Sequence, residues 1–416
     1  MIDNIEERQG FTCTFNTTED CNLACKYCYE INKHRRTLNL ETAKKYIDLL
    51  LSCEDICDLE NSKTFSKNWL YDKITLDFIG GDALMKPKLC NDILSYFVKK
   101  VNTVNTPNAL RWRKDWRVSI STNGTLFSNP DVKAFCEDWK DVLSISVSID
   151  GCPEIHDLNR IYLDGRPSMK DILKNWDWYR KTFPANSRST KSTLSRNSIP
   201  YIYDSLKFMY EEMGIFWINQ NFIMEDTHSI KEDYLLLIDE MNKCIQYTLD
   251  NCDGLYWSMI DKTRFASHEK PELKDWQSRG WCGSGSMPAL GIDGGIYPCF
   301  RWLPHTNNGG HGIMCVGDVN NGIIHKENFV KVQKGSIRSN CTKKEECKNC
   351  EYESSCAYCI GGCFAEFNDF IRTTYICDFT KIQCEAAVKY WNLYNDKKGI
   401  PREFGESKLP DSSKGL

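Results

Sequence analysis

The sequence predicts an α/β protein, a partial (β/α)6 TIM-like barrel followed by a smaller, cysteine-rich C-terminal domain. Two observations predict the barrel. Six strand-then-helix units follow one another, which implies parallel strands with right-handed crossovers, and the first four strands each end in a cysteine or glycine motif. A third observation predicts the second domain, because from residue 282 the chain becomes rich in Cys and Gly and has few long apolar runs. Parallel α/β folds hold ligands beyond the C-terminal ends of their strands, so the functional site is expected there.

The strands are predicted from short runs of β-forming residues that stop at turn motifs. The helices are predicted from apolar residues at helical spacing, as in Ala43, Tyr46 and Ile47 behind the capping residue Asn39. Pro200 suits a first helical position, and Ser229 begins a capping box. The expected strands are 11–17, 74–79, 118–121, 143–149, 189–195 and 215–223, and the expected helices are 40–51, 89–98, 130–139, 168–181, 200–213 and a long helix after 229.

Length and composition indicate an ordinary globular protein. The chain has 416 residues, of which 41% are hydrophobic and 26% charged, and its net charge is −4. This charge argues against a nucleic-acid or membrane-surface role, and the chain shows neither a signal peptide nor an apolar run of about 20 residues. We therefore expect a cytoplasmic protein. It nevertheless has 22 Cys, and because the cytosol keeps thiols reduced, metal ligation explains them better than disulfides.

Three of these thiols stand within eight residues, as Cys21-x3-Cys25-x2-Cys28, with Tyr27 directly before the last one. A cubane [4Fe–4S] cluster usually takes one Cys thiolate per iron. Three thiolates can therefore reach one cluster and leave one of its irons open. A zinc knuckle, or three ordinary buried cysteines, is the alternative interpretation of this motif alone.

This spacing resembles the signature of the radical S-adenosylmethionine (radical SAM) superfamily. In that family the open iron is chelated by the amino and carboxylate groups of S-adenosylmethionine, which is cleaved to a 5′-deoxyadenosyl radical. Gly80-Gly81-Asp82 resembles the Gly-Gly-Glu segment that binds the methionyl ammonium, although Asp stands here for Glu.

The ends of the next two predicted strands add further resemblances. The segment 121–124 resembles the ribose- and carboxylate-binding segment, and the segment 146–160 resembles the fourth-strand region of sulfatase- and peptide-modifying members. The resemblance implies that Asp150 lines the site as a candidate catalytic residue. The remaining residues that it places at the cofactor are Tyr27, Ser121, Asn123, Ser148 and Arg160.

The C-terminal cysteines resemble the SPASM extension of this superfamily, which binds two auxiliary [4Fe–4S] clusters. The extra Cys359 breaks the strict spacing of that extension. Closely spaced Cys pairs also suit Zn²⁺, so a pair of zinc sites is the competing interpretation. By resemblance Cys347, Cys350, Cys356 and Cys377 hold one cluster, and Cys282, Cys299 and Cys363 share the other, with Cys359, Cys341 or no residue as the fourth ligand.

The resemblance therefore divides the chain into a radical SAM partial barrel (1–263), a connecting segment (264–281), a SPASM domain (282–384) and a C-terminal helix with a mobile tail (385–416). It implies an enzyme that abstracts hydrogen from a ribosomally made peptide and forms a thioether or C–C crosslink. The expected partners are a precursor peptide or protein and an electron donor such as flavodoxin or ferredoxin. Only 20 residues precede Cys21, so either a leader-binding module is expected on a separate protein or leader binding uses other surfaces of this chain.

Two alternatives stay open at this point. One is an anaerobic sulfatase-maturating enzyme, which converts Cys or Ser to formylglycine. Such relatives carry an Asp directly after the Pro-Cys of the SPASM hairpin as a proposed base, whereas this chain has Phe300 there. The other is a non-catalytic iron–sulfur or zinc-binding protein, which would leave the strand-end motifs without a purpose.

Overall fold

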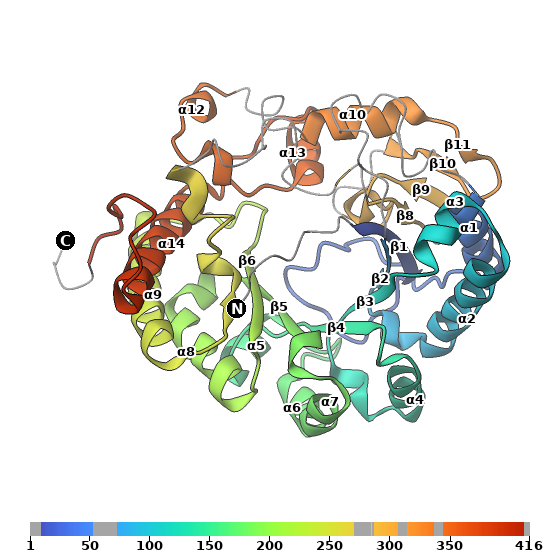
Figure 1. The fold of residues 1–416 in the computed structure, drawn as a ribbon, viewed down its shortest axis with the longest axis horizontal. Coiled ribbons are helices and arrows are strands. Elements are labelled where there is room, and N and C mark those ends of the chain that lie inside the picture. Colours follow the sequence, from blue (N-terminus) through green and yellow to red (C-terminus); the bar gives the residue numbers. More distant parts are fainter. Residues whose placement is uncertain are drawn as a thin grey trace.

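The computed structural model describes residues 10–52, 73–269, 284, 287–306, 314–336 and 344–411, and the strands lie inside an arc of helices (Figure 1). All six predicted strands are present, parallel, and adjacent in chain order. Their bounds are β1 (Gly10–Thr18), β2 (Lys73–Gly80), β3 (Trp116–Thr122), β4 (Leu143–Val147), β5 (Arg188–Leu194) and β6 (Trp217–Phe222).

The two faces of this sheet differ sharply in chemistry. The face toward the helices is apolar and buried, as shown by Phe15, whose ring packs edge-on against Phe78 and against Tyr46 of the first helix. The opposite, concave face carries the alternating residues, because successive side chains of a strand point to opposite sides. The polar residues on this face include Thr12, Thr14, Asn16, Asp77, Ser119, Ser121, Ser146, Ser189, Lys191, Thr193, Asn219 and Asn221.

The predicted helices are also present, with three differences. The predicted helix 168–181 is split in two at Asn175, and the predicted helix 200–213 is a 3-10 turn, a short α-helix and a π-helical turn in succession. The capping box of the long helix is closed by Asp233, which accepts from the backbone N–H of Ile230, rather than by Ser229. The helices are α1 (Leu40–Ser52), α2 (Pro87–Thr103), α3 (Pro107–Trp112), α4 (Pro130–Trp139), α5 (Pro153–Asn159), α6 (Met169–Lys174), α7 (Trp176–Thr182), α8 (Ile202–Lys207) and α9 (Lys231–Asn251).

The C-terminal part of the chain extends the same sheet. β8 (Ala289–Leu290) pairs parallel with β1, and β9 (Gly295–Tyr297) pairs antiparallel with β8, so the two strands form a hairpin. β10 (Gly317–Asp318) and β11 (Gly322–Ile323) continue this edge, while β7 (Tyr256–Trp257) forms the other. In the part of the chain that the structure describes, the sheet keeps two edges and does not close into a full barrel.

Three of the remaining helices, α10 (Lys326–Ser336), α12 (Glu345–Lys348) and α13 (Ile360–Phe367), lie over the open side of the arc (Figure 1). The last helix, α14 (Cys377–Lys398), packs beside α9 at one end of the arc. The predicted domain boundary at residue 384 lies within α14. Of the predicted connecting segment, residues 264–269 are described and end in a 3-10 turn, Ala266–Glu269.

The segment 399–411, predicted to be a mobile tail, is packed against α14. Leu409 is buried, and Ser407 Oγ donates to the carbonyl of Glu385 over 2.7 Å. Polar groups of this segment are satisfied by hydrogen bonds to buried partners. Among all described residues, no helix combines the length and the apolar composition needed to cross a bilayer.

Candidate functional site

The loop with Cys21, Cys25 and Cys28 follows β1 at the C-terminal edge of the sheet, as predicted. It is fixed to the segment after α5, because the N–H of Ala24 donates to the carbonyl of Ile161 over 2.7 Å and the N–H of Lys26 donates to that of Asn159 over 3.0 Å. The N–H of Cys28 closes a turn onto the carbonyl of Cys25 over 3.1 Å. The motif thus faces the residues that follow β4.

The three thiols share one electrostatic environment. Burial raises the pKa of Cys21 to about 12, and the charges of Asp82 and Cys25 add to this effect. The pKa of Cys25 is also raised, by burial and by Cys28 and Asp150, although Arg160 opposes the shift. Within the described residues, no three His, Cys, Asp or Glu side chains converge on a single metal ion. A cubane cluster binds each thiolate through a different iron, so three neighbouring thiols on one loop suit such a cluster.

Gly80 and Gly81 let the end of β2 lie against the start of the cysteine loop. Gly80 has φ +150°, and a Cβ there would stand 2.0 Å from the carbonyl oxygen of Thr18. A Cβ on Gly81 would stand 2.2 Å from the carbonyl oxygen of Asp20. The N–H of Gly81 donates to Thr18 over 2.8 Å and that of Asp82 to Asp20 over 2.9 Å. Both glycines are therefore required by the close approach of the two backbones.

Asp82 connects β2 to the end of β3. Its carboxylate accepts from the N–H of Asn123 over 2.8 Å, from Thr122 Oγ1 over 2.9 Å and from the N–H of Leu84 over 3.0 Å. Burial raises its pKa, and these donors oppose that shift. Because both oxygens are used within the protein, the geometry gives Asp82 a positioning role, whereas the sequence resemblance placed it at the cofactor itself.

Asn123 connects the same edge to the cysteine loop. Its Nδ2 donates to Asn22 Oδ1 over 2.8 Å and lies 3.9 Å from Cys21 Sγ. Its Oδ1 accepts from Thr125 Oγ1 over 2.6 Å, and Asn22 Nδ2 donates to the same Thr125 hydroxyl over 2.8 Å. Asn22 and Thr125 complete a ring of side chains that sequence reasoning did not single out.

Asp150 lies in a buried cluster with Tyr27 and Arg160. The Tyr27 hydroxyl donates to Oδ2, Arg160 Nε lies 3.1 Å from Oδ1, and the N–H of Thr193 donates to Oδ1 over 2.9 Å. The Arg160 guanidinium also lies over the Tyr27 ring, 5.3 Å from its centroid. The structure thus brings together three predicted site residues and ties the cysteine loop to β4 and β5.

His156 beneath this cluster is a structural residue. Its Nδ1 accepts from the N–H of Asp150 over 3.4 Å, and its Nε2 lies 3.0 Å from Ser168 Oγ. Burial lowers its pKa to about 4, so the ring is neutral at pH 7.

Further polar groups near the Cys21 motif, on Ser121, Ser148 and Asn16, could bind a polar ligand. Ser121 and Ser148 are half-buried, and the N–H of Ser148 donates to the carbonyl of Thr122 over 2.8 Å. Asn16 on the concave side of β1 is buried, and neither of its amide atoms has a hydrogen-bond partner among the described residues. Buried amides are normally paired, so a ligand or water must reach Asn16. The donor set therefore fits S-adenosylmethionine beside a cluster on Cys21, Cys25 and Cys28.

Arg301 connects the C-terminal region to the sheet edge that carries the Cys21 motif. The sequence analysis did not single it out. Its guanidinium lies 2.7 Å from Glu225 Oε1 and 4.8 Å from the centroid of the Tyr29 ring. Its pKa is raised because Cys359, Glu225 and Tyr29 outweigh burial. Phe300 beside it approaches the same Tyr29 ring at 5.8 Å.

The C-terminal cysteines form two groups. Burial raises the pKa of Cys377 to about 12, with Cys356 and Cys347 adding to it. The pKa of Lys381 is raised by Asp378 and further by Cys377 and Cys350, so these four cysteines are neighbours. Cys299 and Cys363 lie in a second, apolar cluster, and Cys359 caps α13. Cys282 and Cys341 lie outside the described residues.

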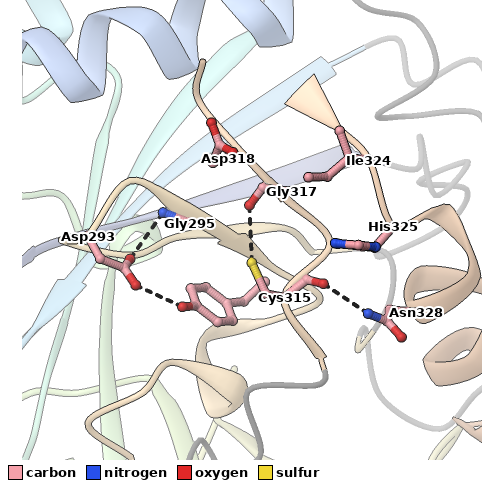
Figure 2. Close-up of a pocket in the computed structure, with 9 residues that line it drawn as sticks. Asp293, Gly295, Cys315, Gly317, Asp318, Ile324, His325 and Asn328 are labelled. Atoms are coloured by element: carbon pink, nitrogen blue, oxygen red, sulfur yellow. Dashed lines mark hydrogen bonds between the residues drawn. The ribbon is translucent and has the colours of Figure 1, made fainter. Parts of the chain in front are cut away.

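A cavity of about 540 Å³ lies in the hairpin extension, as Figure 2 shows. Cys315 Sγ donates to the carbonyl of Gly317 over 3.2 Å, and Asn328 Nδ2 donates to the carbonyl of Cys315 over 3.0 Å. All of its lining residues come from 293–328. It is therefore separate from the edge that carries the Cys21 motif.

No protein-family model matches the chain, whereas three proteins are similar to it in sequence. An uncharacterized protein of Methanocaldococcus jannaschii is 26% identical over 309 residues, covering 73% of this chain and 86% of that protein. The serine-type anaerobic sulfatase-maturating enzyme of Bacteroides thetaiotaomicron is 29% identical over 164 residues, covering 39% and 34%. The subtilosin biosynthesis protein AlbA of Bacillus subtilis is 26% identical over 147 residues, covering 35% and 25%.

Solved structures share the fold over nearly the whole chain. Native anSMEcpe, solved with AdoMet and the Cp18Cys peptide, superposes with a TM-score of 0.67 at 16% identity, covering 93% of this chain and 99% of that one. Streptococcus suis SuiB, solved with its precursor peptide SuiA, gives a TM-score of 0.56 at 13% identity, covering 88% and 76%. The chain therefore shares its fold with anSMEcpe and SuiB, and parts of its sequence with a sulfatase-maturating enzyme and with AlbA.

Proposed function

We propose that the protein is a radical SAM enzyme that abstracts hydrogen from a ribosomally made peptide and closes a thioether or C–C crosslink. The observation that carries this proposal is the convergence of the Cys21–Cys28 loop, the Gly80-Gly81 turn and the Tyr27–Asp150–Arg160 cluster at one edge of a parallel sheet. The related proteins support a peptide substrate, since anSMEcpe and SuiB were solved with peptides.

The chain's own residues would hold and orient the cofactors. When bound, a [4Fe–4S] cluster with S-adenosylmethionine supplies a 5′-deoxyadenosyl radical. Cys21, Cys25 and Cys28 would ligate the cluster. Gly80 and Gly81 would expose backbone atoms to the methionyl group, while Asp82 and Asn123 hold the strand ends in place. The remaining candidates for contact with S-adenosylmethionine are Tyr27, Ser121, Ser148 and Arg160.

Asp150 acts here as the organiser of the site. Its carboxylate already accepts from Tyr27 and Thr193 and pairs with Arg160. These contacts fix the Arg160 guanidinium, whose pKa is raised because Asp150, Tyr27 and Cys25 outweigh burial. Arg160 therefore stays cationic and suits the carboxylate of S-adenosylmethionine.

Two auxiliary clusters in the C-terminal region would accept the surplus electron from the substrate. Cys347, Cys350, Cys356 and Cys377 would hold one, and Cys282, Cys299 and Cys363 would hold the other, with Cys359 as a candidate fourth ligand. A flavodoxin or ferredoxin would deliver the electron that starts each turnover, and a separate protein would present the leader of the peptide. We propose no nucleic-acid or membrane partner.

Conversion of Cys or Ser to formylglycine is the second candidate function. It is favoured by the shared fold with anSMEcpe and by the sequence shared with the Bacteroides enzyme. It is disfavoured by Phe300, whose ring packs toward Tyr29 where the resemblance to that group would require a carboxylate.

The test is anaerobic reconstitution with iron and sulfide, followed by S-adenosylmethionine, reductant and a panel of peptides. The panel contains peptides from small reading frames beside the gene and Cys- and Ser-containing sulfatase peptides. A crosslink should give a product lighter by two hydrogen atoms without an aldehyde, whereas formylglycine reacts with a hydrazide. Deoxyadenosine without any altered peptide, across the panel, would contradict a peptide-modifying role.

A further inference from the structure

We propose that His305 of the C-terminal region is a positioning residue for the cluster loop, because its imidazolium pairs with two buried carboxylates that flank the Cys21–Cys28 motif. By offsetting the charge of Glu30, it also raises the reduction potential of the cluster that this motif would hold. This inference rests on the function proposed above, and it adds a residue outside the cysteine and S-adenosylmethionine sites.

Glu19 and Glu30 stand on either side of the motif. Glu19 precedes Cys21 by two residues and Glu30 follows Cys28 by two residues, and two residues of chain span at most about 7 Å. Both side chains are almost fully buried, with exposed fractions of 1% for Glu19 and 2% for Glu30. Two carboxylates thus lie in the interior of the protein, close to the proposed cluster ligands.

His305 lies between these two carboxylates. Its Nδ1 is 3.8 Å from Glu19 Oε1 and its Nε2 is 3.6 Å from Glu30 Oε1, while its own side chain is 2% exposed. A neutral imidazole carries one N–H, whereas the imidazolium carries an N–H on each ring nitrogen. Because each nitrogen of His305 faces a carboxylate oxygen, the geometry favours the imidazolium.

The two carboxylates differ in their other contacts. Arg36 donates to Glu19 Oε1 from Nη2 over 2.6 Å and from Nε over 3.2 Å. In the part of the chain that the structure describes, neither oxygen of Glu30 has a hydrogen-bond partner, and the partly exposed ammonium of Lys33 is 3.6 Å away. A buried charge without a partner is costly, so Glu30 depends on His305 more than Glu19 does.

The backbone of His305 also contacts the chain just after the motif. Its carbonyl accepts from the N–H of Ile31 over 3.1 Å and from the N–H of Asn32 over 3.0 Å, and Thr306 forms an antiparallel bridge with Glu30. These contacts use main-chain atoms, which a side-chain substitution keeps. Changing the imidazole therefore removes its charge and leaves the backbone link between the two regions.

The charge of His305 matters for the chemistry of the loop. The reduction potential of an iron–sulfur cluster depends on net charge, hydrogen bonds and solvent exposure. The negative charge of Glu30 makes the addition of an electron less favourable, and the positive charge of His305 offsets it. Packing alone does not require an ionic group here, since apolar residues of similar size often replace a buried ion pair without loss of stability.

The first test is a double-mutant cycle in the full chain before iron is added, measured by urea unfolding. His305→Gln should lower the equilibrium constant for folding at least about tenfold, because Glu30 loses its buried partner. In a Glu30→Gln background the same change should cost at least about threefold less. Equal costs of His305→Gln in the two backgrounds would overturn the pairing.

His325→Gln is the matched control. His325 Nδ1 also lies near a carboxylate, 3.2 Å from Glu327 Oε1, but both side chains are exposed to solvent. The same chemical change should therefore lower the equilibrium constant for folding by less than about fivefold.

The second test measures the reduction potential of the reconstituted protein. The N-terminal cluster is the one whose electron paramagnetic resonance signal changes when S-adenosylmethionine is added. At a fixed solution potential, His305→Gln should lower the ratio of reduced to oxidised cluster at least about tenfold, which corresponds to about 59 mV for one electron. Glu30→Gln should raise this ratio, and His325→Gln should leave it unchanged.

The variant with both His305→Gln and Glu30→Gln separates a charge effect from a structural one. It should return toward the wild-type ratio, because the two lost charges cancel, whereas a structural defect would persist. An unchanged or raised ratio in His305→Gln, or a double variant that stays as low as His305→Gln, would overturn the effect on the cluster. Failure of the proposed function looks different, because then no wild-type signal responds to S-adenosylmethionine while the unfolding cycle still decides whether His305 pairs with Glu30.

Discussion

The N-terminal region and the C-terminal region present their cysteines in different ways. Cys21, Cys25 and Cys28 lie on one loop that backbone and side-chain hydrogen bonds tie to the ends of β2, β3 and β4. The C-terminal cysteines are spread over short helices and turns between Cys299 and Cys377. The first site is thus shaped by protein contacts before a cofactor binds. The second is expected to depend more on the metal itself, since bound metal can supply the crosslinks that a small core lacks.

The largest effect is expected from the N-terminal motif. Changing Cys21, Cys25 and Cys28 together to Ala should remove about four irons and abolish deoxyadenosine formation, while the melting temperature stays near that of the wild type. Iron analysis, product assay and calorimetry check this. Cys136→Ala, in the helix-side core, is the control that should retain iron. Undiminished cleavage of S-adenosylmethionine in the triple variant would remove the radical SAM assignment.

In the C-terminal region, by contrast, we expect the loss of cysteines to lower the melting temperature. The reconstituted wild-type protein should hold about twelve irons, and changing Cys347, Cys350, Cys356 and Cys377 to Ala should remove about four of them. This variant should also melt at a clearly lower temperature, because its region loses a metal crosslink. A wild-type content near four irons with zinc as the remainder would leave the barrel assignment standing and remove the SPASM assignment.

The close contact between Gly80 and Thr18 tests whether protein contacts alone shape the N-terminal site. Gly80→Ala should cost at least about 3 kcal/mol of unfolding free energy, because backbone strain combines with overlap onto Thr18. Gly165→Ala is the matched control, since Gly165 also has positive φ but no other atom lies within 4 Å of the position its Cβ would take; it should cost about 1 kcal/mol. If urea unfolding gave the same loss of unfolding free energy for Gly80→Ala and Gly165→Ala, the contact of Gly80 with β1 would not contribute to stability.

The smallest effect on stability is expected at Glu385, whose hydrogen bonds in the C-terminal region involve no metal. Glu385 accepts from Tyr352 Oη over 2.8 Å and from the N–H of Lys408 over 2.5 Å, and His268 Nε2 lies 3.5 Å away. Burial raises the pKa of Glu385, but His268, Lys408 and Tyr352 outweigh it and lower the pKa overall. Glu385→Gln should therefore cost about 1.5–3 kcal/mol at pH 7.

The pH dependence of that loss has a defined sign. A carboxyl whose pKa is lowered by folding stabilises the protein above its unfolded pKa, and this contribution disappears as the pH falls through the folded pKa. Urea unfolding should thus show the wild type and Glu385→Gln converging on acidification. Glu403→Gln, at an exposed pair with Lys262, should cost less than about 1 kcal/mol at any pH. A constant gap between wild type and Glu385→Gln would contradict the role given to the carboxylate.

The sequence by itself determined the six parallel strands, most of the helices and the edge where the Cys21 motif, Gly80 and Asp150 meet. These features follow from local periodicity and from turn residues at strand ends, which act over a few neighbouring residues. It did not determine that Asp233 accepts from the N–H of Ile230, because the local pattern from Ser229 to Glu232 suits a capping box equally well. Only the tertiary structure placed Arg301 beside Tyr29 and residues 399–411 against α14. Those contacts join segments far apart in the chain, and their strength depends on burial and on the curvature of the sheet, which no local pattern encodes.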